Sequence, residues 1–443
     1  MNLSNFKDIF TFELLAINNW SCNQNSYGYK PFKLSNEIKF KTTLHYYKEN
    51  LLKIITLFTS KNKVHPRIKP TDILFILEYN NHLKIYEKLA PLLDKLNVSH
   101  SALYVNEINS NKNNFIGDAF QTLDFSFIFY KFVTDIYLFV SSPNINSIFE
   151  KFLLSSKMLL NSYFYFKGAL FIKNIYQPKL VIFFRVDGII NRSLTLGLKK
   201  ETIPNMCIQH GSITNHPIFS NVLVDEFVSW GEIFSNYIIQ SGSSCKTKAI
   251  GSVEYDELFL RAQNNIYTKL GTKIKLLLMT PSGISYSLLS DKDLMLKLAR
   301  SIDRNKYEIT FKPHPGDLCQ ENEVFAKKLN FEYLPPNYNL SFENYDIIIL
   351  NNSSSGIESA IFSKPLILVA EKLDNIVVKH YLNEEIGLFA SDETTFIDAL
   401  NKIELEYTVF QGNCKKFTNK YLANHGKATE KLADYLSTKV CVA

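Results

Sequence analysis

The stretch YEITFKPHP, residues 307–315, decides which fold to expect for this chain. YEITF alternates and is rich in β-branched and aromatic side chains, which is typical of a strand. Pro313 and Pro315 then end regular structure, so Lys312 and His314 stand in a stiff turn where the strand ends. Ligands of open α/β sheets bind at the carboxyl ends of the strands. The stretch therefore predicts such a sheet, with a cation and an imidazole at its ligand-binding edge.

On both sides of this stretch, apolar runs alternate with helical patterns along most of the chain. This alternation predicts parallel sheets covered by helices. The predicted strands cover residues 72–77, 103–105, 179–186, 205–209, 226–231 and 248–252 in the first half, and 275–280, 307–311, 346–350 and 365–369 in the second. The two sets of strands predict an α/β fold with two units.

The length of 443 residues also favours two units, because single cores stop growing at about 250–300 residues. We expect a helical N-terminal extension over 1–70 and an N-terminal Rossmann-like acceptor or catalytic domain over 71–250. A C-terminal Rossmann-like donor domain is expected over 251–443. The polar segment 256–274 has the composition of a linker between the two domains.

Composition narrows the class of protein. The net charge of +6 is modest, and no basic run or known motif points to nucleic acid. The six cysteines include no CxxC pair, which favours reduced thiols over a disulfide framework or a zinc site. The N-terminus lacks a signal-peptide layout, and no uncharged apolar run reaches 18 residues. These features predict a cytoplasmic protein.

One segment suggests contact with a membrane surface. Residues 151–176 mix four lysines with large aromatic side chains, a composition suited to an anionic membrane surface. A core helix with solvated lysines explains the same pattern equally well. Peripheral contact with the inner face of the cytoplasmic membrane is therefore one of two interpretations.

Small polar residues follow the predicted strand 346–350, in NNSSSGIESA over 351–360. Serine hydroxyls and free N–H groups at the start of a helix can hold a phosphate, although ordinary helix capping is the alternative. Glu358 in the first turn could also reach a ribose. The predicted donor-nucleotide residues of this unit are Thr280, Lys312, His314, Ser353, Ser354, Ser355, Gly356 and Glu358.

Two further strand ends carry candidate catalytic groups in the first unit. Asp187 follows the strand 179–186 in RVDG, and His210 follows the strand 205–209 in QHG. Both types of side chain can move a proton, while helix capping by Asp187 and a structural histidine are the alternatives. Arg185, Gln209 and Gly211 are the neighbouring candidates for the acceptor side of the cleft.

The motifs VDG, QHG, IGS, KPHP and SSSG, in this order, resemble those of bacterial surface-polysaccharide glycosyltransferases with the two-domain GT-B fold. Over residues 179–370 they are similar to the capsule Kdo transferases and the sialyl- and polysialyltransferases. The resemblance implies two Rossmann-like domains facing a central cleft. It also implies that His314 and Ser353–Ser355 hold the donor phosphate and that Asp187 does the chemistry. Val186 stands where that family often has a second acid.

The leading functional hypothesis is transfer of a CMP-linked ulosonic acid, such as Kdo or a sialic-type acid, onto a capsule, lipopolysaccharide or O-antigen glycan. The expected partners are a nucleotide-sugar donor and a glycan acceptor, with a lipid-linked acceptor as one option. No cofactor, metal or nucleic acid is expected. Asp187 would act as a general base, giving inversion, or as a nucleophile, giving retention.

Three other readings stay open. A CDP-glycerol or polyol-phosphate transferase of the teichoic-acid type would use His210 as its base. A UDP-sugar 2-epimerase-like enzyme would use the cleft carboxylates and histidine to abstract a sugar proton. A non-catalytic interaction protein would keep only the nucleotide site.

Overall fold

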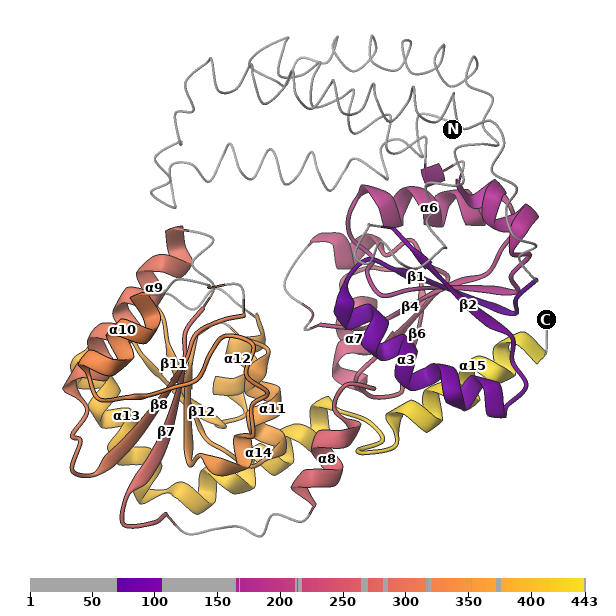
Figure 1. Ribbon diagram of the computed structural model, residues 1–443. Coiled ribbons are helices and arrows are strands. Elements are labelled where there is room, and N and C mark those ends of the chain that lie inside the picture. The colour runs from indigo at the N-terminus through magenta and orange to yellow at the C-terminus, as the bar shows by residue number, and fades with distance from the viewer. Residues whose placement is uncertain are drawn as a thin grey trace, which may run out of the picture.

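The structure is a computed structural model of the 443-residue chain (Figure 1). It describes residues 70–105, 165–166, 168–211, 213, 217–263, 270–281, 286–315, 317, 321–351, 353–371 and 376–441. Nearly all of the predicted N-terminal extension, and most of the aromatic region that includes 151–164, lie outside the described residues.

The first sheet contains six parallel strands in the order β2-β1-β3-β4-β5-β6 among the described residues. They are β1 (Ile73–Leu77), β2 (His100–Tyr104), β3 (Leu180–Phe183), β4 (Asn205–Ile208), β5 (Glu226–Ser229) and β6 (Lys246–Ala249). The chain order reverses between β1 and β3. In doubly wound folds such a reversal opens a ligand-binding crevice at the carboxyl ends of the strands.

The second sheet is also parallel and has the order β12-β11-β10-β7-β8-β9. Its strands are β7 (Ile274–Met279), β8 (Tyr307–Lys312), β9 (Glu332–Tyr333), β10 (Ile347–Leu350), β11 (Leu366–Val369) and β12 (Gly387–Ala390). Renumbered from β7, this order is the Rossmann order 3-2-1-4-5-6. The reversal lies between β7 and β10.

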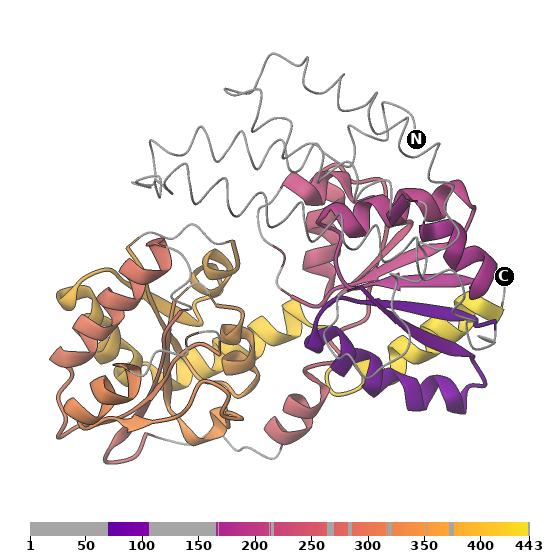
Figure 2. The same cartoon turned by 45° about the horizontal axis from the view of Figure 1, so that its top comes forward.

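Helices cover both faces of each sheet (Figures 1 and 2). Around the first sheet they are α3 (Asn80–Lys95), α6 (Ile189–Lys200) and α7 (Glu232–Gln240). The chain continues through α8 (Asp256–Ala262), α9 (Tyr286–Leu298), α10 (Glu321–Lys328), α11 (Ser355–Ile361), α12 (Ile376–Asn383), α13 (Glu393–Leu405), α14 (Tyr407–Tyr421) and α15 (Ala428–Cys441).

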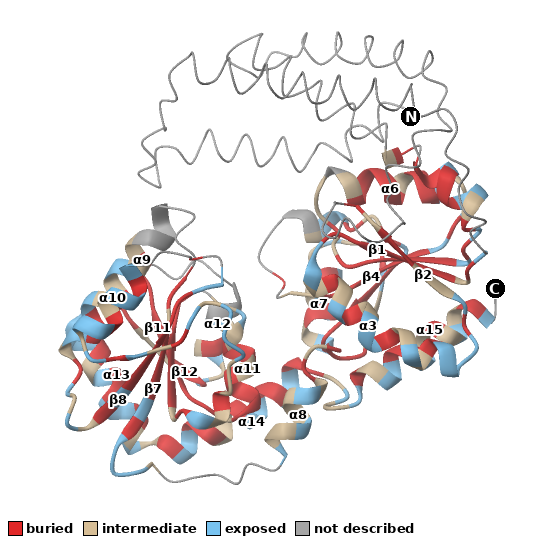
Figure 3. Cartoon of the chain, in the orientation of Figure 1, coloured by how far each residue is buried: buried red, intermediate tan, exposed pale blue. Residues whose placement is uncertain are grey.

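Most of the predicted strands form close to their expected positions because they are apolar runs buried on both faces, as parallel strands require (Figure 3). The edge strands β2 and β6 are exceptions, since they are only partly buried and begin two or three residues before their predicted positions. The short strands β9 and β12 were not predicted. The predicted linker 256–274 contains the helix α8, with Asp256 and Glu257 in its first turn, where carboxylates are favoured.

The C-terminal helix α15 returns to the first sheet and packs beside α3. Its buried side chains Leu432, Leu436 and Val440 join the same apolar cluster as Ile85 and Leu89 of α3. The predicted domain limits at 70, 250 and 443 stay a prediction. The helix α15 belongs to the predicted C-terminal domain in sequence, but it packs on the first sheet.

The return path of the chain explains the glycine of the IGS motif. Gly251 has φ +110°, and a Cβ atom there would collide with the carbonyl of Ala423. Gly231 meets the carbonyl of Tyr421 in the same way. Both glycines therefore let the segment between α14 and α15 pass tightly over the ends of β5 and β6.

Among the residues that the structure describes, no helix is long and apolar enough to cross a membrane.

Candidate functional site

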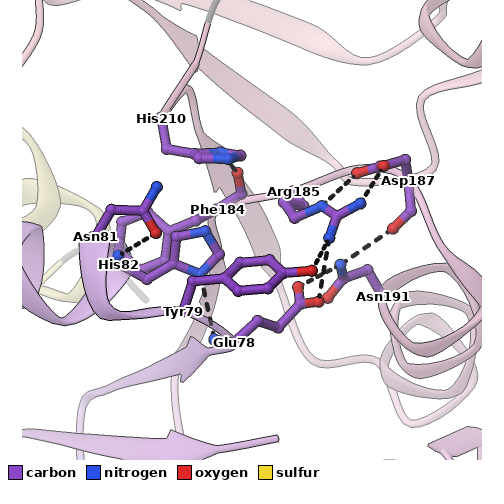
Figure 4. A network of polar contacts seen from close by, with 9 residues as sticks. All are labelled: Glu78, Tyr79, Asn81, His82, Phe184, Arg185, Asp187, Asn191 and His210. Atoms are coloured by element: carbon purple, nitrogen blue, oxygen red, sulfur yellow. Dashed lines mark hydrogen bonds and ion pairs between the residues drawn. The ribbon is translucent and has the colours of Figure 1, made fainter. Parts of the chain in front are cut away.

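The carboxyl ends of three neighbouring strands bring charged and imidazole side chains together at one edge of the first sheet (Figure 4). Glu78 follows β1, Arg185 and Asp187 follow β3, and His210 follows β4. Because β3 pairs with both β1 and β4, these side chains converge at the reversal of strand order. The two predicted catalytic residues are thus in one cluster.

Arg185 organises this edge. Its Nε donates to Oδ1 of Asp187 at 2.8 Å, and its Nη2 pairs with Oδ2 of the same carboxylate. Its Nη1 donates to the hydroxyl of Tyr79 at 2.6 Å and lies 3.7 Å from Oε2 of Glu78. This bidentate pair fixes the orientation of the guanidinium and carboxylate planes relative to each other. The guanidinium of Arg185 is therefore bound by side chains of the protein itself. Its predicted role on the acceptor side stays a prediction.

The two carboxylates differ in their protonation. Burial opposes ionisation of Asp187, but the hydrogen bonds and the charge of Arg185, with smaller contributions from the backbone and His210, together hold the pKa of Asp187 below its usual value. Burial raises the pKa of Glu78, although the hydrogen bond from Asn191 at 2.6 Å and the charge of Arg185 act against the rise. Asp187 is thus the firmly ionised member of the pair.

His210 is a neutral imidazole at this edge. Its Nδ1 is bonded to the carbonyl of Phe184, so Nδ1 carries the proton and Nε2 keeps its lone pair. Burial lowers the pKa of His210 and the charge of Arg185 lowers it further, whereas the hydrogen bond to the Phe184 carbonyl and the charge of Asp187 oppose the shift. A neutral ring with a basic Nε2 can accept a proton from a hydroxyl group.

Gln209 and Gly211 have different settings. Gln209 is buried, with Oε1 accepting from the amide of Trp230 at 2.9 Å and Nε2 donating to the carbonyl of Gly211 at 2.9 Å. The indole N–H of Trp230 donates to the carbonyl of Gln209. Gln209 therefore joins β4 to β5, while a Cβ atom at Gly211 would meet nothing within 4 Å.

In the second sheet, the predicted donor residues also follow neighbouring strands. Thr280 follows β7, Lys312 ends β8, and the serine turn follows β10. The register pairs Met279 with Lys312, and β7 lies between β8 and β10. The three turns therefore share one sheet edge. Thr280 is buried, and its hydroxyl has no hydrogen-bond partner among the described residues.

Lys312 and His314 take different positions. Lys312 is buried, and its Nζ donates to the carbonyl of Pro336 at 3.0 Å. Burial lowers the pKa of this lysine, and Glu358 opposes the shift. His314 is exposed in the turn beyond it. Partial desolvation of its imidazole lowers the pKa of His314, the charge of Lys312 lowers it further, and Asp317 opposes the shift.

The serine turn rests on Tyr381, which sequence reasoning did not select. The buried Tyr381 hydroxyl donates to the carbonyls of Ser353 and Ser354 at 3.2 and 3.4 Å. The hydroxyl of Ser353 accepts from the amide of Ser355 at 3.2 Å. A Cβ atom on Gly356 would lie 2.5 Å from the Tyr381 ring, so the small residue at 356 serves this packing.

Glu358 faces a second glutamate across the junction of the two units. Burial raises the pKa of Glu358 to about 7, Glu254 raises it further, and Lys312 acts against the rise. Glu254 lies between β6 and α8, and burial likewise raises its pKa to about 7 against the charges of Lys88 and Lys84. The two carboxyl groups therefore sit in a shared, poorly solvated region.

A cavity of about 470 Å³ lies away from these clusters, at the start of β7 and β8. Its lining includes Lys275, Arg304, Glu308 and Tyr338. It contains none of the predicted site residues.

Glu78, His82 and Asn191 also belong to the first cluster, although none of them was predicted from the sequence. Glu78 could have been found, because it directly follows a buried strand at the start of the sheet. His82 could also have been found, because it precedes Ile85, Leu89 and Leu93 at helical spacing and so belongs to the apolar face of α3. Asn191 gave no signal in the sequence.

No protein-family model matches the chain, and no curated protein matches it by sequence. Solved structures do match in fold. The Staphylococcus aureus protein MnaA with UDP has 12% identity and a TM-score of 0.52, covering 84% of this chain and 97% of its own. The UDP-GlcNAc 2-epimerase from Neisseria meningitidis, bound to UDP-GlcNAc, has 14% identity and a TM-score of 0.51, covering 83% and 99%.

A third match is a Listeria monocytogenes protein assigned as a UDP-N-acetylglucosamine 2-epimerase, with 12% identity and a TM-score of 0.54. It covers 84% of this chain and 96% of its own. Identities this low show the fold alone. Together with the two parallel sheets, they establish an α/β fold with two Rossmann-like units in the GT-B architecture.

Proposed function

We propose that this protein is a glycosyltransferase that moves a sugar from a nucleotide-activated donor to a hydroxyl group of a glycan. The observation that carries the proposal is the pairing of two strand-end clusters in the GT-B architecture. One cluster offers a neutral histidine beside an arginine–carboxylate pair, and the other offers an imidazole and a serine turn suited to a phosphate. The leading donor is a CMP-linked ulosonic acid, and the leading acceptor is a bacterial surface glycan.

On the donor side, His314 and the hydroxyls of Ser353–Ser355 would hold the nucleotide phosphate. Donors already arranged around a leaving group stabilise the charge that develops as the bond to the sugar breaks. The ammonium of Lys312, which donates to the carbonyl of Pro336, would add positive charge at the same sheet edge. Glu358 is the candidate for the ribose hydroxyls.

On the acceptor side, we assign the role of general base to His210. Both oxygens of Asp187 are engaged by Arg185 and its pKa is low, so it is a weaker base than the sequence implied. The acceptor O–H bond breaks and its proton passes to Nε2 of His210. The oxygen forms the new bond to the sugar, and the nucleotide leaves with the electron pair. Asp187 then balances the positive charge gained by His210.

The same geometry favours polyol-phosphate transfer from a CDP-linked donor as the second candidate. In that reaction His210 would also deprotonate the acceptor hydroxyl, but the oxygen would attack phosphorus. The observation in its favour is that His210, and not Asp187, has the available basic atom.

The test is a thermal-shift screen against CMP, CDP, UDP, GDP and ADP on the wild type and on His314→Ala. A ligand that binds only the folded state stabilises it by mass action and so raises the Tm. At a ligand concentration of 100 times the Kd, the free energy of unfolding increases by about 2.7 kcal/mol. We expect CMP to raise the Tm of the wild type and to lose this effect in His314→Ala. His100→Ala, which changes a histidine of β2, is the matched control and should respond like the wild type.

The outcomes separate the candidates. A preference for CDP would favour polyol-phosphate transfer, and a preference for UDP would favour a UDP-sugar transferase or epimerase. Absence of any shift with all five nucleotides would contradict the donor site.

Peripheral contact of segment 151–176 with the inner face of the cytoplasmic membrane is part of the proposal. Its test is flotation with anionic liposomes, before and after replacement of the four lysines. Absence of flotation, both with and without the four lysines, would remove membrane contact from the proposal.

A further inference from the structure

His82 is a buried histidine that the proposed transfer does not use. It lies in the first turn of α3 with 0% of its surface exposed. Its Nδ1 accepts a hydrogen bond from the backbone N–H of Glu78 at 3.2 Å. Since Nδ1 is the acceptor, the neutral ring carries its proton on Nε2. Nε2 is buried and has no hydrogen-bond partner among the described residues.

Three aromatic rings fix the orientation of His82. Phe184 stacks on it with ring centroids 5.0 Å apart, and Tyr79 meets it edge-on at 5.3 Å. The third ring is that of His210, at 4.7 Å and 77°. Because Nδ1 points to Glu78, the Nε2 edge of the ring lies on the side where His210 is found (Figure 4). Buried polar groups without a partner are rare in native proteins and call for an explanation.

Phe184 connects the two histidines. Its ring stacks on His82, and its carbonyl accepts from Nδ1 of His210. A shift of the His82 ring would therefore disturb both the packing around His210 and the hydrogen bond that selects its tautomer.

We propose that His82 is a positioning residue for His210, holding its ring on the Phe184 carbonyl with the Nε2 lone pair presented to the acceptor hydroxyl. The role in transfer rests on the proposed function, while the effect on the His210 ring does not. The unpaired Nε2–H of His82 places the positive end of a dipole beside His210, which opposes early protonation of that ring. Burial lowers the pKa of His82 to about 3, so the proton taken by His210 is not passed inward.

Among the residues that the structure describes, the charged groups that act on His210 are Arg185, which also opposes its protonation, and Asp187, which favours it. Both come from the segment after β3, whereas His82 acts from α3. Changing His82 therefore leaves the Arg185–Asp187 pair in place.

The direct test is a pH titration of histidine side chains by NMR in protein labelled with ¹⁵N-histidine. The chain has nine histidines, and the His210 signals are those lost in His210→Gln. Two variants are used. His82→Phe keeps a planar ring but removes Nε2–H, and His82→Asn keeps an acceptor for the Glu78 amide but removes the ring. His100→Asn, at the other end of the same sheet, is the control.

We expect wild-type His210 to be neutral with its proton on Nδ1. In either His82 variant we expect a shift of its titration and the appearance of the second tautomer, with no change in His100→Asn. An unchanged titration and tautomer in the folded His82 variants would overturn the proposal, and one folded variant is enough to decide.

Kinetics supply a second readout. The kcat of the His82 variants should fall by up to about 100-fold, with the KM for the donor unchanged and the acidic limb of the pH–rate profile displaced. A rise in donor KM with an unmoved profile would contradict a positioning role. Absence of transfer by the wild type would refute the proposed function alone, because the NMR experiment needs no substrate.

Discussion

Replacing Glu254 by glutamine should stabilise the protein at alkaline pH. Burial raises the pKa values of Glu254 and Glu358 from 4.5 to about 7, and the charge of Glu254 raises the pKa of Glu358 further. A carboxyl group with a raised pKa contributes stability below its unfolded pKa, and this contribution is lost as the pH rises through the folded pKa. The wild type should therefore lose stability between about pH 4.5 and pH 7.

The magnitude follows from the size of the rise. At about 1.4 kcal/mol for each pKa unit, a rise from 4.5 to about 7 corresponds to about 3 kcal/mol at pH 8. Glu254 keeps part of its surface exposed, so solvent screening reduces the expected gain to about 1–2 kcal/mol. At pH 4.5 the variant and the wild type should be nearly equal, because a protonated glutamate resembles glutamine.

The assay is urea unfolding of wild type and Glu254→Gln at intervals from pH 4.5 to pH 8.5. Glu257→Gln is the matched control, since Glu257 is an exposed neighbour in α8 and should leave the pH dependence unchanged. The reasoning fails if Glu254→Gln is less stable than the wild type at pH 8, or if both lose stability equally as the pH rises.

Three further substitutions test the packing around the two clusters by thermal or urea unfolding. Arg185→Met should cost about 3–5 kcal/mol, because it leaves Glu78 and Asp187 without their partner, and a loss below 1 kcal/mol would contradict its organising role. Gly356→Ala should cost about 1–3 kcal/mol through collision with the Tyr381 ring, whereas Gly412→Ala in the open interior of α14 should be neutral or stabilising. Leu436→Ala should cost about 2–5 kcal/mol, and a negligible cost would contradict the packing of α15.

Much of the architecture could be predicted because the strands of parallel sheets are short apolar runs with little ambiguity. DIIIL and YEITF fall within a residue of β10 and β8. The strand β9 has two residues, and β12 has only partly buried side chains at Leu388 and Phe389, so neither stands out as an apolar run. The helix α8 was hidden because its seven residues include no buried side chain.

The candidate site was predictable only where a polar residue follows a recognisable strand. His210, Asp187 and His314 were found in this way, and their roles stay predictions. The sequence could not show that Arg185 engages both oxygens of Asp187, since that depends on the turn geometry after β3. Nor could it show that Tyr381 supports the serine turn, because Tyr381 lies 28 and 27 positions after Ser353 and Ser354 and the contact depends on tertiary packing.

The return of the chain over Gly231 and Gly251 limits where this protein can recombine with others of the same architecture. Because α15 belongs to the apolar cluster of the first sheet, the second Rossmann-like unit is in effect an insertion between α8 and α15. A single crossover near residue 250 would join a foreign α15 to the native α3. Recombination that brings in a new nucleotide-binding half while preserving the first sheet therefore needs two breakpoints, the second between Tyr421 and Ala428. Chimeras with only one should expose the apolar face of α3 and aggregate.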